Sequence, residues 1–269
     1  MCYPEAINMI PFNCSHHDIS HSIKLTIIDV RELSRPVLQV LDDHFVSICE
    51  GASGSDISTV KKHVVKLFDE KKPNWVMGAI AEFFIHLYLK LLGFKQECLF
   101  LNLEEYSIKK GFDGYYSQDG IEWLMESKSG SIQSDGVSHA DKVHEAMRDL
   151  EDKVLGKSKK KKVNNPWRNA YSHASHYDVG TAEKIRKNIK ALSDDFTAGR
   201  FHRIEEFNTI PCGTIFLSGV WSPPNHQKIY ESICNLSGKL KGKSVHAICI
   251  TQTSVELFKQ YIKGDTLDG

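Results

Sequence analysis

The sequence predicts an α/β protein in which a mixed central sheet is flanked by helices. The first observation is the order of expected elements, a helix, three strands, two helices, and then strand, helix, strand, helix. The second is that segments 214–221 and 244–251 are short, apolar and rich in β-formers, as buried strands are. Strands that alternate with helices in this way are typical of a sheet covered by helices.

An N-terminal segment, residues 1–55, is expected to pack on a main domain formed by residues 56–269. The Gly- and Ser-rich stretch 50–55 marks the break between them. Within the segment we expect a strand at 22–29 and a short helix at 35–44, which begins beside a proline.

The main domain opens with a helix that Asp56 can cap. The strongest helix follows Pro73, carries Trp75 and later apolar residues at helical spacing, and ends at Gly93. We expect residues 165–177, which hold Trp, Arg, Tyr and two His, to form a packed loop. Further strands are expected at 98–103, 112–116 and 121–127, and further helices at 139–155, 181–196, 225–236 and 253–261.

The strands at 112–116 and 121–127 carry an acid, a turn and a Glu-x-Lys triplet. Asp119-Gly120 between them is a strong hairpin signal. Because side chains alternate along a strand, Glu126 and Lys128 share one face while Ser127 points away. Folding back at the turn therefore brings Asp113 alongside Glu126 and Lys128.

This set of side chains is suited to binding a divalent cation and hydrolysing a phosphodiester. Asp113 and Glu126 offer hard oxygen ligands for Mg²⁺, or for Mn²⁺, with help from the backbone carbonyl of Ser127. The metal would activate a water molecule and neutralise charge that develops on the phosphate. Lys128 would position that water or stabilise the charged oxygen. Glu82, on an apolar helix, is either a fourth catalytic residue or half of a structural ion pair.

The arrangement resembles the PD-(D/E)xK nuclease superfamily, although Phe112 stands where the motif name has proline. The resemblance implies a restriction-endonuclease-like core. The wider context comprises a helix with Ala81-Glu82, the stretch 110–114, the Glu-Ser-Lys strand and a helix with residues 146–150. This context is similar to the HamA family, the nuclease subunits of the Hachiman antiphage-defence systems, over roughly residues 75–155.

The resemblance implies a DNA endonuclease that serves as the effector of a bacterial antiphage defence. Its implied partner is a superfamily 2 helicase subunit, HamB-like, which restrains the nuclease and triggers it. Two alternatives stay open from the residues themselves. One is a stand-alone, type II-like restriction endonuclease with the same core, and the other is a non-catalytic helicase regulator on a nuclease fold.

Charge and composition bear on partners and compartment. The net charge is zero, but residues 155–203 carry twelve Lys or Arg against four Asp or Glu. A local basic segment of this kind can contact DNA or an acidic partner, and we favour such a contact for Lys157–Lys162 over a solvated loop. Seven scattered cysteines, no leader pattern and no long apolar run predict a cytoplasmic protein without membrane contact.

Overall fold

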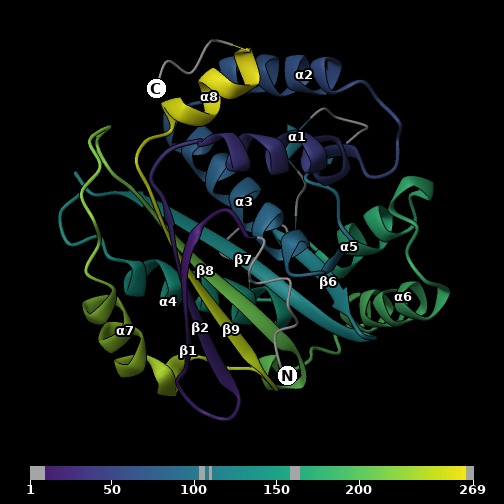
Figure 1. Ribbon diagram of the computed structural model, residues 1–269. Helices are drawn as coiled ribbons and strands as arrows, with labels where there is room; N and C mark the ends of the chain where they lie inside the picture. Colours follow the sequence, from purple (N-terminus) through teal and green to yellow (C-terminus); the bar gives the residue numbers. More distant parts are fainter. Residues whose placement is uncertain (1–9, 103–106, 109–110, 158–163, 265–269) are drawn as a thin grey trace.

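The computed structural model describes residues 10–102, 107–108, 111–157 and 164–264. In this part of the chain, a seven-stranded mixed sheet runs through the molecule with helices on both faces (Figure 1). Four consecutive strands of this sheet, β2, β9, β8 and β7, are parallel, and the other pairings are antiparallel. The predicted α/β class with a mixed sheet is therefore confirmed. In sheet order the strands are β1 (Asn13–Asp18), β2 (Ile23–Val30), β9 (Val245–Gln252), β8 (Asn208–Phe216), β7 (Ile121–Ser131), β6 (Gly114–Gln118) and β3 (Lys95–Gln96).

Helices cover the sheet in two groups, each over its own apolar core. One core lies under the first three helices and the last, and the other lies under the four helices between them. The first group is α1 (Arg35–Glu50), α2 (Ile57–Asp69), α3 (Pro73–Leu91) and α8 (Glu256–Lys263). The second is α4 (His139–Val154), α5 (Pro166–Ala174), α6 (Glu183–Thr197) and α7 (His226–Asn235). Short elements are β4 (Leu101–Asn102), β5 (Ser107–Ile108), η2 (Tyr177–Val179), η3 (Ile204–Glu206) and η4 (Ser237–Lys239).

Strand β7 separates the two cores, and its alternation fixes which way the motif faces. Trp123 and Met125 belong to the core under α3, whereas Leu124 belongs to the core under α4. By the same alternation Glu126 and Lys128 share one face, as the sequence predicts, and the structure shows that this face points towards α4.

Local signals in the sequence account for the elements on either side of the motif. The side chain of Asp56 caps α2, and α3 ends before Gly93, whose φ of +81° suits a glycine after a helix. Strands β6 and β7 join through Asp119 (φ +51°) and Gly120 (φ +76°), both in the left-handed region of a two-residue hairpin. The hairpin prediction is confirmed.

Strand β8 begins earlier than expected, at Asn208, and ends at Phe216, so residues 217–221 are not part of it. Pro211 and Gly213 lie inside this strand. Both residue types are uncommon within strands, so the sequence does not predict a strand there. The structure gives Gly213 a packing role. A β-carbon there would lie 2.7 Å from the carbonyl oxygen of His139, so α4 approaches β8 closely only because the side chain is absent.

Other boundaries differ in smaller ways. The strand expected at 98–103 is replaced by β3 and β4, which are two residues each. The helix expected at 35–44 continues to Glu50 as α1. Strand β1 was not predicted, and residues 1–55, expected only to pack on the main domain, supply β1 and β2 to the central sheet.

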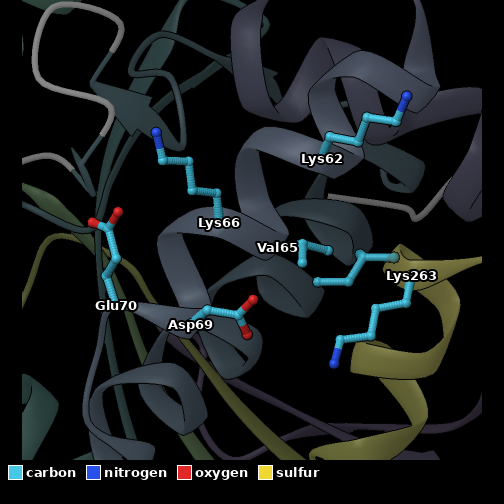
Figure 2. Close-up of a pocket in the computed structure, with 7 residues that line it drawn as sticks. Lys62, Val65, Lys66, Asp69, Glu70 and Lys263 are labelled. Atoms are coloured by element: carbon cyan, nitrogen blue, oxygen red, sulfur yellow. The ribbon is translucent and has the colours of Figure 1, made fainter.

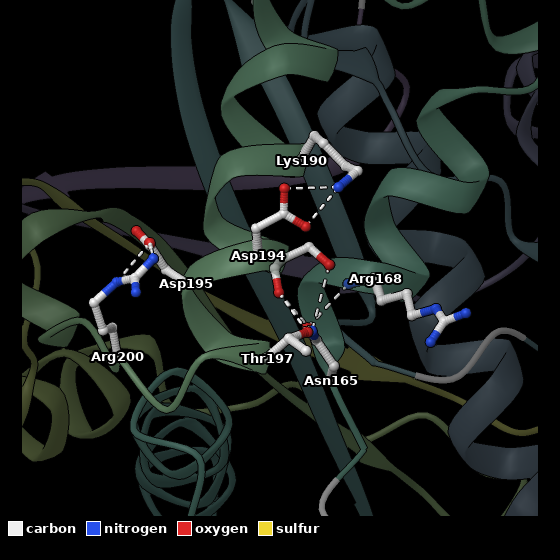
Figure 3. Close-up of polar contacts among 8 residues, drawn as sticks. Asn165, Arg168, Lys190, Asp194, Asp195, Thr197 and Arg200 are labelled. Carbon is white, nitrogen blue, oxygen red and sulfur yellow. Dashed lines mark hydrogen bonds and ion pairs between the residues drawn. The ribbon is translucent and has the colours of Figure 1, made fainter.

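The stretch expected to be a packed loop at 165–177 contains helix α5. Asn165 caps this helix by accepting a hydrogen bond from the Arg168 amide at 3.1 Å. Its amide nitrogen also donates to the Ser193 carbonyl (2.9 Å) and to Thr197 Oγ1 (3.1 Å), which ties α5 to α6 (Figure 3). Trp167 is only 1% exposed, so this helix is part of the core under α4.

The lowered pKa values of two buried histidines predict how the stability of the fold depends on pH. Burial lowers the pKa of His246 to about 3 and of His139 to about 4, from an ordinary 6.5. Because the folded pKa lies below the unfolded one, neutral histidine stabilises the fold above pH 6.5. We expect that contribution, about 2–5 kcal/mol for each residue, to be lost as the pH falls towards 4.

Urea denaturation at pH 7, 6 and 5 measures this loss. His246→Gln should be less stable at pH 7, since His246 Nε2 lies 2.8 Å from Thr26 Oγ1. Its unfolding free energy should also fall less steeply between pH 6.5 and 5 than that of the wild type. Equal slopes for the two proteins would show that His246 is not held neutral.

Candidate functional site

The candidate site lies where β6 begins, beside the middle of β7, on the face that α4 covers. Asp113 precedes β6 by one residue, and its Oδ2 accepts a hydrogen bond from the Ser127 amide at 2.9 Å. This bond fixes the carboxylate against the backbone directly after Glu126. The predicted approach of Asp113 to the Glu-Ser-Lys triplet is therefore present.

Glu126 and Lys128 form an ion pair on the face of β7 that points towards α4. The Lys128 Nζ lies 2.8 Å from Glu126 Oε1. Glu126 is 1% exposed, so its charge depends on partners within the protein. The spacing of two along a strand thus produces the shared face that the sequence predicts.

Helix α4 contributes two residues that the sequence motif does not place in the site. Asp149 Oδ2 lies 2.8 Å from Lys128 Nζ, and Lys153, in the last turn of α4, is hydrogen-bonded to Glu126 Oε2. Their spacing of four places both on one side of the helix. That spacing is the one sequence signal that could have indicated them.

The charges of the site act strongly on one another. Burial and the charge of Glu82 raise the pKa of Asp113, and burial and the charge of Asp113 raise the pKa of Glu126. Burial alone would lower the pKa of Lys128 and Lys153, but the carboxylates of Glu126 and Asp113 raise both. The two lysines therefore stay protonated, while placing two negative charges side by side costs free energy.

Glu82 approaches the site from the other side of the sheet. It lies on α3, is 5% exposed, and its Oε1 is 3.2 Å from Nε2 of His86, one turn further along. The other ring nitrogen of His86 is hydrogen-bonded to the hydroxyl of Tyr116 on β6. Glu82 thus has a polar neighbour on its own helix, which forms an ion pair with it only when His86 is protonated, and the charge of Glu82 also reaches Asp113.

The residues present fit a divalent metal in charge and in donor type. Among the described residues no group of three or more His, Cys, Asp or Glu side chains gathers into a ready-made metal site. Asp113 and Glu126 nevertheless supply two carboxylates, and in the described part of the chain only one oxygen of Asp113 accepts a hydrogen bond. The amide and carbonyl of a strand residue point to the same side, so the Ser127 carbonyl also points past the end of β6. The site holds four acidic residues and two lysines, namely Glu82, Asp113, Glu126 and Asp149 beside Lys128 and Lys153.

Two grooves in the described part of the chain lie away from the candidate site. One of about 510 Å³ runs between α2 and α8, and Figure 2 shows lysine and acidic side chains around it. Another, of about 420 Å³, lies beside Asp29 and Trp221. Neither is lined by Asp113, Glu126 or Lys128. The residues that line the first groove are Lys62, Val65, Lys66, Asp69, Glu70, Ile262 and Lys263.

Two of the expected features lie outside the described residues. Lys110 of the motif stretch is one, and the lysines at 159–162 of the basic segment are the other. Among the helices that the structure describes, none combines the length and apolar character that crossing a membrane requires. A comparison with protein-family models finds no match, and a search of curated proteins finds none.

Proposed function

We propose that this protein is a metal-dependent DNA endonuclease whose active site is Asp113, Glu126 and Lys128. The observation that carries the proposal is the placement of the buried Glu126. It is ion-paired with Lys128 on the same strand, and Asp113 accepts a hydrogen bond from the backbone amide of the following residue, Ser127. Two carboxylates and a protonated lysine at one strand suit phosphodiester hydrolysis.

Each residue has a role that follows from its position. Asp113, Glu126 and the Ser127 carbonyl would hold Mg²⁺ or Mn²⁺, which supplies charge neutralisation at the phosphate. Lys128 carries a positive charge on the same face as Glu126, where it would stabilise negative charge on the phosphate or position the attacking water. Asp149 holds the Lys128 ammonium in place at 2.8 Å.

The sheet topology supports a PD-(D/E)xK restriction-endonuclease-like core as part of the proposal. After α3, the antiparallel strands β3, β6 and β7 lead into α4, and β8 then joins β7 in parallel. The Glu-Ser-Lys triplet thereby lies on an inner strand, with α4 across its face. A rigid inner strand keeps the charged groups in register.

The biological part of the proposal rests on the resemblance of residues 75–155 to the HamA nuclease subunits. In that setting the protein is the effector of a bacterial antiphage defence. A superfamily 2 helicase would keep it inactive and release it when foreign DNA is encountered. The basic residues after α4 are then candidates for contacts with DNA or with the helicase.

The test is incubation of purified protein with plasmid and linear DNA in Mg²⁺ or Mn²⁺, with and without the helicase and ATP. General degradation is the expected result. Discrete fragments would indicate a stand-alone restriction endonuclease instead. No cleavage under any of these conditions would overturn the enzymatic proposal and favour a non-catalytic regulator.

A further inference from the structure

Both carboxylate oxygens of Glu126 are occupied by lysines. Lys128 Nζ lies 2.8 Å from Oε1, and Lys153 is hydrogen-bonded to Oε2. The lysines come from different elements, β7 and α4, so the tertiary packing of α4 on the sheet creates this double pairing. Each carboxylate oxygen has two lone pairs, so these bonds take about half of the acceptor sites of Glu126, and a metal that binds Glu126 competes with the two ammonium groups.

The two lysines differ in how firmly they are held. Lys128 has a second carboxylate partner, Asp149, at 2.8 Å. Within the described ranges, Glu126 is the one hydrogen-bonded carboxylate of Lys153. Lys153 lies in the last turn of α4, and its side chain is 27% exposed against 21% for Lys128. Lys153 is thus the partner that is easier to displace.

Lys153 also acts on both proposed metal ligands. Its ammonium is hydrogen-bonded to Glu126 and lies near enough to Asp113 for the two opposite charges to attract. A metal at this site would likewise be a cation shared by the two carboxylates. The ammonium of Lys153 thus supplies part of the same neutralisation in the absence of metal.

We propose that Lys153 is an internal cation that stands in for the divalent metal at Glu126 and is displaced when the metal binds. The inference rests on the proposed nuclease site and adds a competitor to it. Lys153 stabilises the metal-free protein and weakens its affinity for metal. It is a positioning residue for the metal-free state, whereas Lys128 stays at the site in both states.

Calorimetric titration of Mn²⁺ into the full-length protein tests this competition without any measurement of cleavage. Lys153→Met should bind Mn²⁺ at least about tenfold more tightly than the wild type, because the competing charge is gone. The melting temperature of Lys153→Met without metal should be lower than that of the wild type. Mn²⁺ should raise the melting temperature of Lys153→Met by more than it raises that of the wild type.

Three further variants make the result specific. Lys153→Arg keeps the positive charge and should not gain affinity, and Lys153→Gln should behave like Lys153→Met if the apolar variant folds poorly. Lys259→Met removes a lysine that is ion-paired on α8 and should bind Mn²⁺ as the wild type does. Unchanged or weaker binding by Lys153→Met and Lys153→Gln would overturn the inference and leave the proposed nuclease intact. Absence of Mn²⁺ binding in every protein would overturn both.

Discussion

Glu126→Gln is expected to lower the rate of DNA cleavage by about a thousandfold, which corresponds to about 4 kcal/mol of transition-state stabilisation. The amide keeps the size of the side chain but removes the charge that would hold the metal. It also leaves Lys128 and Lys153 without their shared carboxylate, since each is bonded to one oxygen of Glu126. The rate should be measured at saturating Mn²⁺ and again at low Mn²⁺, where the deficit should be larger.

Glu122→Gln is the matched control. It makes the same change four residues earlier on β7, on the same face, where Glu122 bonds the hydroxyl of Tyr115 and the amide of Asn188. Its cleavage rate should stay near that of the wild type. If both variants lose activity equally, the loss comes from damage to β7 and not from a metal ligand. If Glu126→Gln cleaves normally, the proposed site is wrong.

Lys128→Met should lower DNA cleavage by about a hundredfold to a thousandfold, because under the proposed mechanism it removes the positive charge that would stabilise the reacting phosphate. It does not remove an oxygen ligand. The affinity for Mn²⁺ should therefore be no weaker than in the wild type. Loss of cleavage with retained metal binding separates the role of Lys128 from that of Glu126.

The measurement pairs single-turnover cleavage with Mn²⁺ titration on the same preparation. Lys259→Met, on α8, serves as the control for loss of a paired lysine far from the site. A Lys128→Met protein that cleaves DNA at the wild-type rate would remove Lys128 from the mechanism. One that fails to bind Mn²⁺ would show that Lys128 organises the ligands and acts through them.

The motif strands could be predicted because their signals are local. The Asp119-Gly120 turn fixes the hairpin, and the period of two along β7 then fixes which face carries Glu126 and Lys128. Helix α3 was predictable for a similar reason, because its apolar residues recur at helical spacing between a proline and Gly93. In these elements, neighbours along the chain are sufficient to determine the structure.

The rest of the site depends on contacts between distant segments. A lysine such as Lys153 on an amphipathic helix is typical of a solvated face, and only the close packing of α4 on β8 brings it to Glu126. Gly213, which permits that packing, makes β8 look unlike a strand in sequence. Strand β1 was missed because Asn-Cys-Ser-His-His-Asp lacks an apolar alternation, as an edge strand can when its neighbour β2 supplies the core contacts.

The most direct test of the central claim is anomalous diffraction from crystals of the protein soaked in Mn²⁺. The account predicts an anomalous peak within coordination distance, about 2.0–2.3 Å, of carboxylate oxygens of both Asp113 and Glu126, with Lys153 turned away from Glu126. Saturating Mn²⁺ with no peak between these two carboxylates, in a protein that still degrades DNA, would contradict it.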